Sequence, residues 1–192
     1  MSNIILASSS AQRRKLLKLT GIRFRVIPSR AKEAARIKTT CSDLVKHNAL
    51  LKAQEVASRF KTGIVIGADT LVYAGKKIII GKPRNLKDAK RILKILTSSP
   101  QWVYTGVAVI DIATGRKLLD YEKTKVFMHK LLDEEINRYH QLTSPLDKAG
   151  GFDIEGRGAL FINRIDGCYT NVIGLPLPKL RVMLKRFGVH LL

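Results

Sequence analysis

The segment Ile64-Val65-Ile66-Gly67-Ala68-Asp69-Thr70 decides how this chain folds. Its first five residues are apolar or small, which is typical of a central strand buried on both faces of a sheet. We expect Asp69 and Thr70 at the carboxyl end of that strand. In open α/β sheets ligands bind beyond the carboxyl ends of the strands, where a carboxylate can hold a divalent cation or activate water. An aspartate that only caps a turn is the alternative for Asp69.

Strand-like and helix-like segments alternate on both sides of this segment. Residues 4–7 form a short apolar run, and residues 102–112 and 117–128 predict a long antiparallel hairpin around Thr114-Gly115. The apolar spacing or boundary residues of four segments indicate helices: residues 11–19, 42–60, 86–96 and 176–187. Asp133-Glu134-Glu135 opens a fifth helix, with acids at the positive end of its dipole. We therefore predict an α/β fold with a mixed sheet flanked by helices, in one domain over residues 1–192.

The composition is that of a globular protein with an excess of positive charge. Hydrophobic residues make up 45% of the 192 residues, and 35 Lys and Arg against 15 Asp and Glu give a net charge of +20. Such an excess attracts nucleic acid, nucleotides or an anionic membrane surface, although a basic solvated surface without a partner is equally consistent with it. No apolar stretch approaches the length of a membrane span, and no signal peptide is evident. We expect a cytoplasmic protein with no membrane partner.

The junction between the first strand and the first helix has the chemistry of an anion site. Ser8, Ser9 and Ser10 precede the helix, and Arg13 lies in its first turn. Free backbone N–H groups at a helix N-terminus favour anions, and serine hydroxyls and cations strengthen that preference. A serine N-cap with surface cations is the simpler alternative. No Walker motif accompanies these residues, so a P-loop ATPase is not supported.

Two later segments also combine glycine with residues that can bind a nucleotide. Gly81-Lys82-Pro83 places a lysine between a glycine and a proline, which suits phosphate binding, although a solvated loop lysine is the simpler interpretation. Residues 147–156 (DKAGGFDIEG) contain Phe152, which could stack on a base, and Glu155, which could accept from a base edge. A flexible glycine loop is the alternative for this second segment.

Six motifs, taken together and in order, resemble the Maf family of nucleoside triphosphate pyrophosphatases over almost the whole chain. They are residues 6–17 (LASSSAQRRKLL), 67–72 (GADTLV), 81–83 (GKP), 104–107 (YTGV), 145–151 (PLDKAGG) and 171–177 (NVIGLPL). The resemblance implies the fold of inosine triphosphate pyrophosphatases, an elongated mixed sheet with two lobes around a central cleft. It also implies cleavage of a nucleoside triphosphate to monophosphate and pyrophosphate with a divalent cation (Mg, Mn or Co). A homodimer is left open.

The resemblance further implies a role for individual residues. Asp69 would act as general base or metal ligand, Glu33 would hold the metal, and Lys82 would neutralise charge on the phosphates. The remaining residues would bind the substrate: Ser8, Ser10, Gln12, Arg13, Lys52, Thr70 and Glu155.

Base specificity is where the sequence departs from the patterns of the family. Relatives that act on dTTP and UTP carry Arg, Thr and Gln at three positions, and relatives that act on 7-methyl-GTP carry Trp, Gln and Glu. This chain has Gln12, Thr70 and Glu155 there. A glutamate acceptor suits the N1–H and amino edge of guanine, whereas Gln12 and Thr70 suit a pyrimidine. We expect a guanine-type or broad specificity among 7-methyl-GTP, dTTP and UTP.

A basic nucleic-acid-binding module without catalysis is the second functional hypothesis. The net charge of +20 motivates it, and a weak non-specific attraction to nucleic acid is compatible with either hypothesis. The sequence has neither zinc-ligand spacing nor a recognition-helix motif, and aromatic residues make up only 6% of it. The motifs therefore favour the enzyme.

Overall fold

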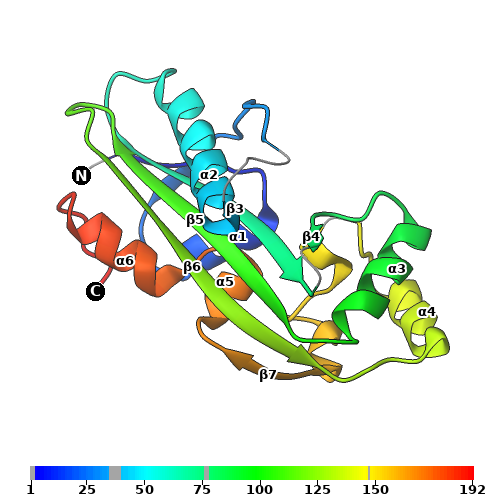
Figure 1. Cartoon of the computed structure of the whole chain (residues 1–192). Coiled ribbons are helices and arrows are strands. Elements are labelled where there is room, and N and C mark those ends of the chain that lie inside the picture. The colour runs from blue at the N-terminus through cyan, green and yellow to red at the C-terminus, as the bar shows by residue number, and fades with distance from the viewer. Residues whose placement is uncertain (1–2, 35–39, 76–77, 147) are drawn as a thin grey trace. The chain divides into compact units, whose positions relative to one another are not determined.

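The computed structural model describes residues 3–34, 40–75, 78–146 and 148–192, and its described strands form one mixed sheet (Figure 1). The order along the sheet is β2-β1-β3-β5-β6-β7, and β4 pairs with β3. The strands are β1 (Ile4–Leu6), β2 (Phe24–Val26), β3 (Ile64–Ala74), β4 (Ile78–Ile80), β5 (Gln101–Asp111), β6 (Lys117–Met128) and β7 (Ile162–Asp166). The helices are α1 (Ala11–Lys18), α2 (Cys41–Ala57), α3 (Leu86–Leu96), α4 (Asp133–Leu142), α5 (Tyr169–Ile173) and α6 (Leu177–Lys185). The predicted α/β class is confirmed.

The chain divides into two compact units. Unit 1 comprises Met1–Thr70, Thr105–Glu122 and Gly174–Leu192, and unit 2 comprises Leu71–Tyr104 and Lys123–Ile173. Strands β3, β5 and β6 contribute residues to both units. Within the described ranges, no helix combines the length and the apolar character needed to cross a bilayer.

Strand β3 is longer than the apolar segment that predicts it. Asp69 and Thr70 lie inside the strand rather than at its end, so that expectation was wrong. The strand continues because β4 pairs antiparallel with its last residues, for example Val72 with Ile80, and supplies backbone partners there. The parallel neighbour β1 ends at Leu6, which pairs with Ile66. Asp69 therefore still lies beyond the carboxyl end of a parallel strand.

Other boundaries differ from the sequence prediction by smaller amounts. Helix α2 begins at Cys41, before the predicted Ser42, because the Thr40 hydroxyl accepts a hydrogen bond from the Asp43 N–H at 3.2 Å and caps the helix. The glycine-rich region predicted as a loop contains two short 3₁₀ turns, η1 (Ala149–Gly151) and η2 (Arg157–Leu160). Helix α5 was not predicted, since five residues are too few to display a period.

Helix α2 lies close to the sheet because the strands below it carry glycine. A Cβ on Gly67 would stand 2.3 Å from the Ala49 carbonyl oxygen, and a Cβ on Gly106 would stand 2.3 Å from the Val45 carbonyl oxygen. The two glycines therefore set the distance between helix and sheet. The core around them is made of alanine and β-branched side chains: Ile5, Ala7, Ala49, Ala53, Val56, Val65, Ala108 and Ile110.

Helix α2 also holds the loop that follows β2. Glu55 accepts hydrogen bonds from the Ser29 hydroxyl and the Arg30 N–H, both at 2.9 Å. Asn48 accepts from the Ala34 N–H at 2.9 Å and donates to the Ala34 carbonyl oxygen at 3.0 Å. Asn48 and Glu55 are two helical turns apart and share one face of α2. The described part of the loop is thus fixed at two points along that face.

The core of unit 2 lies among α3, α4, the strands and the segment that contains the 3₁₀ turns. Its buried side chains are Val72, Ala74, Ile80, Ile92, Leu93, Leu96, Val103, Val126, Ile136, Tyr139, Phe152 and Phe161. We expected Phe152 to be available for stacking on a base, but only 7% of it is exposed. Gly150 adopts a positive φ, and a Cβ there would stand 3.0 Å from both Phe152 and Leu96. The turn therefore directs this ring into the core.

Replacing Gly106 with alanine should lower the free energy of unfolding by about 3 kcal/mol, because the new methyl group meets helix backbone that cannot move alone. Denaturant unfolding followed by circular dichroism measures the change. Gly81→Ala is the matched control, since a Cβ at Gly81 has nothing within 4 Å. Equal stability of the two variants would show that the helix does not depend on this contact.

The stability of unit 1 should depend on the ionisation of Glu55. A hydrogen bond from Arg59, supported by the Arg30 N–H and the Ser29 hydroxyl, lowers the pKa of Glu55 from 4.5 to about 2. A carboxyl group with a depressed pKa contributes stability above its unfolded pKa and loses it as the pH falls through the folded pKa. Urea unfolding at neutral and acidic pH should therefore show a smaller loss between about pH 4.5 and 2 for Glu55→Gln than for the unmodified chain. Glu134→Gln, which changes an exposed glutamate on α4, should keep the full loss.

Candidate active site

Serine residues build the junction between β1 and α1. Ser10 is the N-cap of α1, and its hydroxyl accepts a hydrogen bond from the Arg13 N–H at 3.3 Å. The Ser10 N–H donates to the Ser8 hydroxyl at 3.2 Å. Ser8 is buried, whereas Ser10 and Gln12 are half-buried. The junction therefore has the predicted serine cap together with a helix N-terminus, whose partial positive charge favours an anion.

The Arg13 side chain joins α1 to β3 and to the segment that leads into α6. Its Nε donates to the Gly174 carbonyl oxygen at 2.9 Å, and its Nη1 donates to the Ala68 carbonyl oxygen at 2.9 Å. Nη1 also donates to the Ser8 hydroxyl at 3.3 Å, and Nη2 to the Thr70 hydroxyl at 2.9 Å. These bonds use most of the N–H groups of the guanidinium.

Arg13 places a fixed positive charge inside unit 1. Only 9% of the residue is exposed. Burial lowers the pKa of its guanidinium, and attraction to the carboxylates of Asp69 and Glu33 opposes that shift. Because arginine stays protonated in proteins, the buried charge persists at neutral pH.

Lys52, Asp69 and Glu33 form the charged centre of unit 1. The Lys52 Nζ lies 2.7 Å from Asp69 Oδ1 and 3.0 Å from Glu33 Oε1. Lys52 and Asp69 are each 8% exposed, and Glu33 is exposed. Buried charges require partners, and here one ammonium serves two carboxylates.

Asn48 completes this centre, although no motif of the sequence pointed to it. Its Nδ2 donates to Asp69 Oδ2 at 3.0 Å, so Lys52 and Asn48 hold the two oxygens of the carboxylate. Asn48 lies one turn before Lys52 on α2. In the sequence, Asn48 is recognisable only as a polar residue beside the apolar positions Val45 and Ala49 of the buried helix face. Many capping or surface residues show the same pattern.

Unit 2 brings two of the predicted segments together. The Gly150 N–H donates to the Gly81 carbonyl oxygen at 3.0 Å, and a Cβ on Gly151 would stand 3.1 Å from Pro83 Cγ. Lys82 lies between Gly81 and Pro83 and is exposed. The turn that presents this lysine is therefore braced by the glycines of the later motif.

The residues expected to select the base are divided between the units. Gln12 and Thr70 belong to unit 1, and Glu155 is an exposed residue of unit 2. The Thr70 hydroxyl accepts the Arg13 hydrogen bond, which ties this residue to the buried guanidinium. Asp147, part of the segment expected to bind the base, lies outside the described residues.

The carboxylates of unit 1 have the chemistry to hold a divalent cation. The described residues contain no group of three or more His, Cys, Asp or Glu side chains that could hold a metal. Glu33 and Asp69 nevertheless converge on one ammonium, which places two hard oxygen donors around one point. Mg²⁺ and Mn²⁺ prefer such oxygens and commonly take their remaining ligands from water and phosphate.

Comparison with known proteins places this architecture in a family. A family model described as "Maf-like protein" matches residues 3–187. A dTTP/UTP pyrophosphatase from Pelotomaculum thermopropionicum is 42% identical over 192 residues, which cover 100% of both chains. Another from Dictyoglomus turgidum is 44% identical over 190 residues, which cover 98% of each chain.

A solved structure shares the fold at low sequence identity. The Staphylococcus aureus Ham1 protein superimposes with a TM-score of 0.56 at 13% identity, covering 96% of this chain and 99% of that one. The likeness supports the predicted mixed sheet flanked by helices. Because the family model and relatives above 40% identity match almost all of its length, this chain belongs to the family of Maf-like proteins.

Proposed function

We propose that this chain is a nucleoside triphosphate pyrophosphatase that converts dTTP and UTP to the monophosphate and pyrophosphate. The observation that carries the proposal is the Lys52 ammonium held between Asp69 and Glu33 in the unit that also contains the α1 N-terminus. Hydrolysis of a phosphoanhydride requires a general base that deprotonates water, positive charge that stabilises the phosphates, and a site that binds the phosphate anion. Unit 1 contains a group suited to each task.

Asp69 is the proposed general base. Water attacks one of the phosphorus atoms joined by the bridging oxygen between the α and β phosphates, and Asp69 accepts a proton from that water. The bond from the attacked phosphorus to the bridging oxygen breaks, and its electron pair leaves with that oxygen. Lys52 and Asn48 hold the two Asp69 oxygens, so the carboxylate keeps one orientation during the reaction.

The phosphate chain is proposed to bind to cations and to the helix terminus. Ser8 and Ser10 would present hydroxyls at the N-terminus of α1, and Lys82 would neutralise charge that develops on the phosphates. Arg13 has most of its N–H groups engaged inside unit 1, so its proposed contribution is the buried positive charge together with the position of Ser8. The Lys52 ammonium would attract a phosphate of the substrate in addition to the two carboxylates.

Glu33 and Asp69 would hold the divalent cation that the Maf resemblance implies. When bound, such a cation neutralises phosphate charge and makes water easier to deprotonate. The chain supports this role by fixing the loop next to Glu33, because Asn48 bonds both backbone polar groups of Ala34.

The pyrimidine nucleotides are proposed as substrates because the relatives bear the name dTTP/UTP pyrophosphatase. This proposal replaces the guanine-type preference that Glu155 suggests. Gln12 can donate and accept hydrogen bonds, which suits the O4 and N3–H edge of thymine or uracil. A carboxylate at Glu155 can also accept from the N3–H, so the residue does not require guanine.

The purified chain with Mg²⁺, Mn²⁺ or Co²⁺ should release pyrophosphate, and not orthophosphate, from dTTP and UTP faster than from 7-methyl-GTP and the other canonical triphosphates. Asp69→Asn should lower kcat by about 10²–10⁴-fold because general base catalysis contributes that much. Lys82→Ala should lower kcat by about 10²-fold, the smaller end of the range for electrostatic stabilisation. A coupled pyrophosphate assay measures each rate.

Lys61→Ala, which removes an exposed lysine of unit 1, is the matched control and should keep full activity. Thermal melting of each variant separates loss of chemistry from loss of folding. Full turnover in folded Asp69→Asn and Lys82→Ala would remove the assignment of the site. A preference for 7-methyl-GTP would restore the guanine-type expectation.

Asn48 should act as a positioning residue, with different consequences for two substitutions. Asn48→Ala releases Ala34 and should raise the Mn²⁺ concentration needed for half-maximal activity, since the backbone next to Glu33 is no longer held. Asn48→Asp keeps an acceptor for the Ala34 N–H but adds negative charge beside Asp69. Asp69 Oδ2 then faces a second carboxylate in place of the Nδ2 donor, so kcat should fall even where the loop is still held.

His47→Ala changes an exposed neighbour on α2 and should alter neither readout. A merely structural role for Asn48 predicts lower stability with an unchanged kcat in folded Asn48→Asp, and that result would contradict the assignment.

A further inference from the structure

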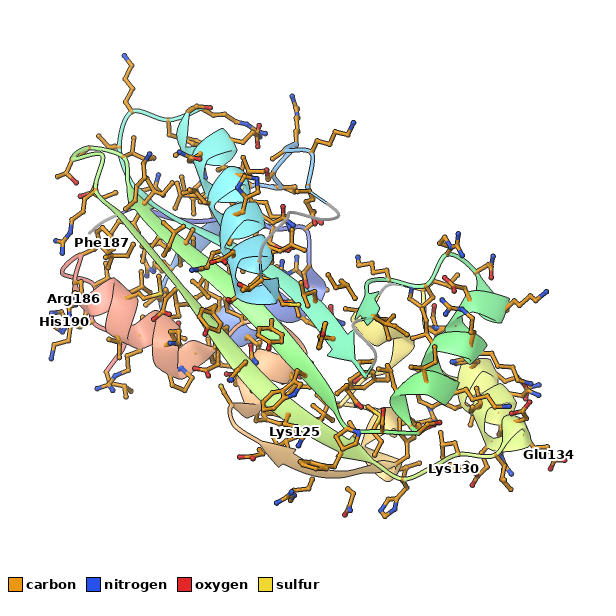
Figure 2. The ribbon with its side chains drawn as sticks, in the orientation of Figure 1. Lys125, Lys130, Glu134, Arg186, Phe187 and His190 are labelled. Atoms are coloured by element: carbon orange, nitrogen blue, oxygen red, sulfur yellow. The ribbon has the colours of Figure 1, made fainter. Side chains whose placement is uncertain are left out.

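One face of the unit 2 sheet alternates basic and aromatic side chains. Along β6, Lys123, Lys125 and Phe127 lie on this face, whereas Thr124 and Val126 between them are buried on the other. Lys123 is exposed, and Lys125 and Phe127 are half-buried. The face is therefore accessible within unit 2, and Figure 2 labels Lys125 on it.

Neighbouring strands add a second ring and another cation to this face. The Lys123 Nζ lies 5.0 Å from the centre of the Trp102 ring on β5, and the Lys125 Nζ lies 5.6 Å from the same ring. Lys125 is also 5.0 Å from the centre of the Phe127 ring, and the Arg164 Cζ on β7 is 4.2 Å from it. We call these five residues the basic–aromatic face.

The sheet register keeps this arrangement in place. Phe127 pairs with Arg164 across the β6–β7 ladder, and Lys125 pairs with Asp166. Asp166 is an exposed acid at the edge of the face, opposite one of its lysines. The rings are thus fixed by strands and covered by cations that approach from different strands, a geometry in which a ring attracts positive charge to its surface.

We propose that the basic–aromatic face binds single-stranded nucleic acid. The flat surfaces of Trp102 and Phe127 match unpaired bases, which stack on aromatic rings whatever their sequence. Lys123, Lys125 and Arg164 lie over these rings, so they can move from ring to phosphate as a base takes their place. In a duplex the base faces are covered by their neighbours, so single strands bind more tightly.

Other partners fit this face less well. An acidic peptide would satisfy the cations but would leave the rings without planar partners. A bilayer surface would favour apolar side chains that protrude, whereas Trp102 and Phe127 are half-buried in the sheet. The net charge of +20 by itself predicts stronger attraction to a duplex, whose phosphate charges are more closely spaced than those of a single strand. The proposed preference for single strands therefore goes beyond charge, and it does not depend on the proposed catalytic residues.

Trp102 is the only tryptophan of the chain and reports on its own contacts through fluorescence. An oligothymidylate of about 12 nucleotides with a 5′-hydroxyl end suits the usual site sizes and should quench this fluorescence. It should bind at least about tenfold more tightly than a duplex of equal length. A saturating concentration of dTTP should not displace it, because the face contains none of the residues proposed to bind the nucleotide.

Variants separate the face from the total charge. Lys123→Ala with Lys125→Ala should weaken binding to the single strand about tenfold and reduce the slope of log affinity against log salt by about 1.4. Lys61→Ala with Lys117→Ala removes the same charge from exposed positions of unit 1 and should keep the preference for single strands. In fluorescence anisotropy of a labelled strand, Trp102→Phe should retain binding and Trp102→Ala should lose about tenfold. Hydrolysis of dTTP should stay unchanged in the Lys123/Lys125 variant.

Four results would overturn the proposal. Equal binding of duplex and single strand, or equal losses in the two double-lysine variants, would show only background attraction. Displacement of the oligonucleotide by dTTP would place it in the nucleotide site. Quenching by phosphatidylglycerol vesicles without quenching by the oligonucleotide would identify a lipid surface as the partner. Circular dichroism confirms that each variant is folded.

Discussion

Helix α2 can reach Asp69 only because Gly67 and Gly106 leave no side chain between the helix and the sheet. A Cβ at either position would lie 2.3 Å from a carbonyl oxygen of the helix, so the helix backbone would have to move outward. Asn48 and Lys52, one turn apart on that helix, would move with it. A buried carboxylate without partners costs several kcal/mol, a large part of the margin by which a domain is stable. The two glycines therefore support both the fold and the charged centre.

One face of α2 organises the residues around this centre. Asn48 holds the Ala34 end of the preceding loop, Glu55 holds its beginning, and Lys52 between them pairs with Glu33. The same Asn48 amide that fixes the loop also fixes Asp69. The position of the loop and the orientation of the carboxylate are therefore coupled through Asn48. A rigid helix positions such a side chain more precisely than a flexible loop does.

The end of the short β1 strand determines where along β3 the charged centre lies. Because β1 stops at Leu6, the Ala68 carbonyl oxygen lies beyond the paired part of that edge. Arg13 Nη1 donates to this oxygen at 2.9 Å, and the Lys52 Nζ lies 3.5 Å from it. The Arg13 and Lys52 cations thus both contact the Ala68 carbonyl oxygen, next to Asp69 in the chain.

Local pattern in the sequence determined the helix over residues 86–96, the long hairpin and the buried start of β3, because periodicity and turn residues act over a few positions. The motifs also singled out Asp69 and Lys82 as candidates. Tertiary structure alone decided that β3 continues through Asp69, that Asn48 holds this carboxylate, and that Phe152 turns into the core. Each of these outcomes depends on partners far away in the chain, such as β4, α2 and Leu96. The spacing of neighbouring residues does not show which distant residue will make a contact. Tertiary structure likewise turned Arg13 inward, where carbonyl oxygens and hydroxyls from several elements replace the water that a surface arginine would keep.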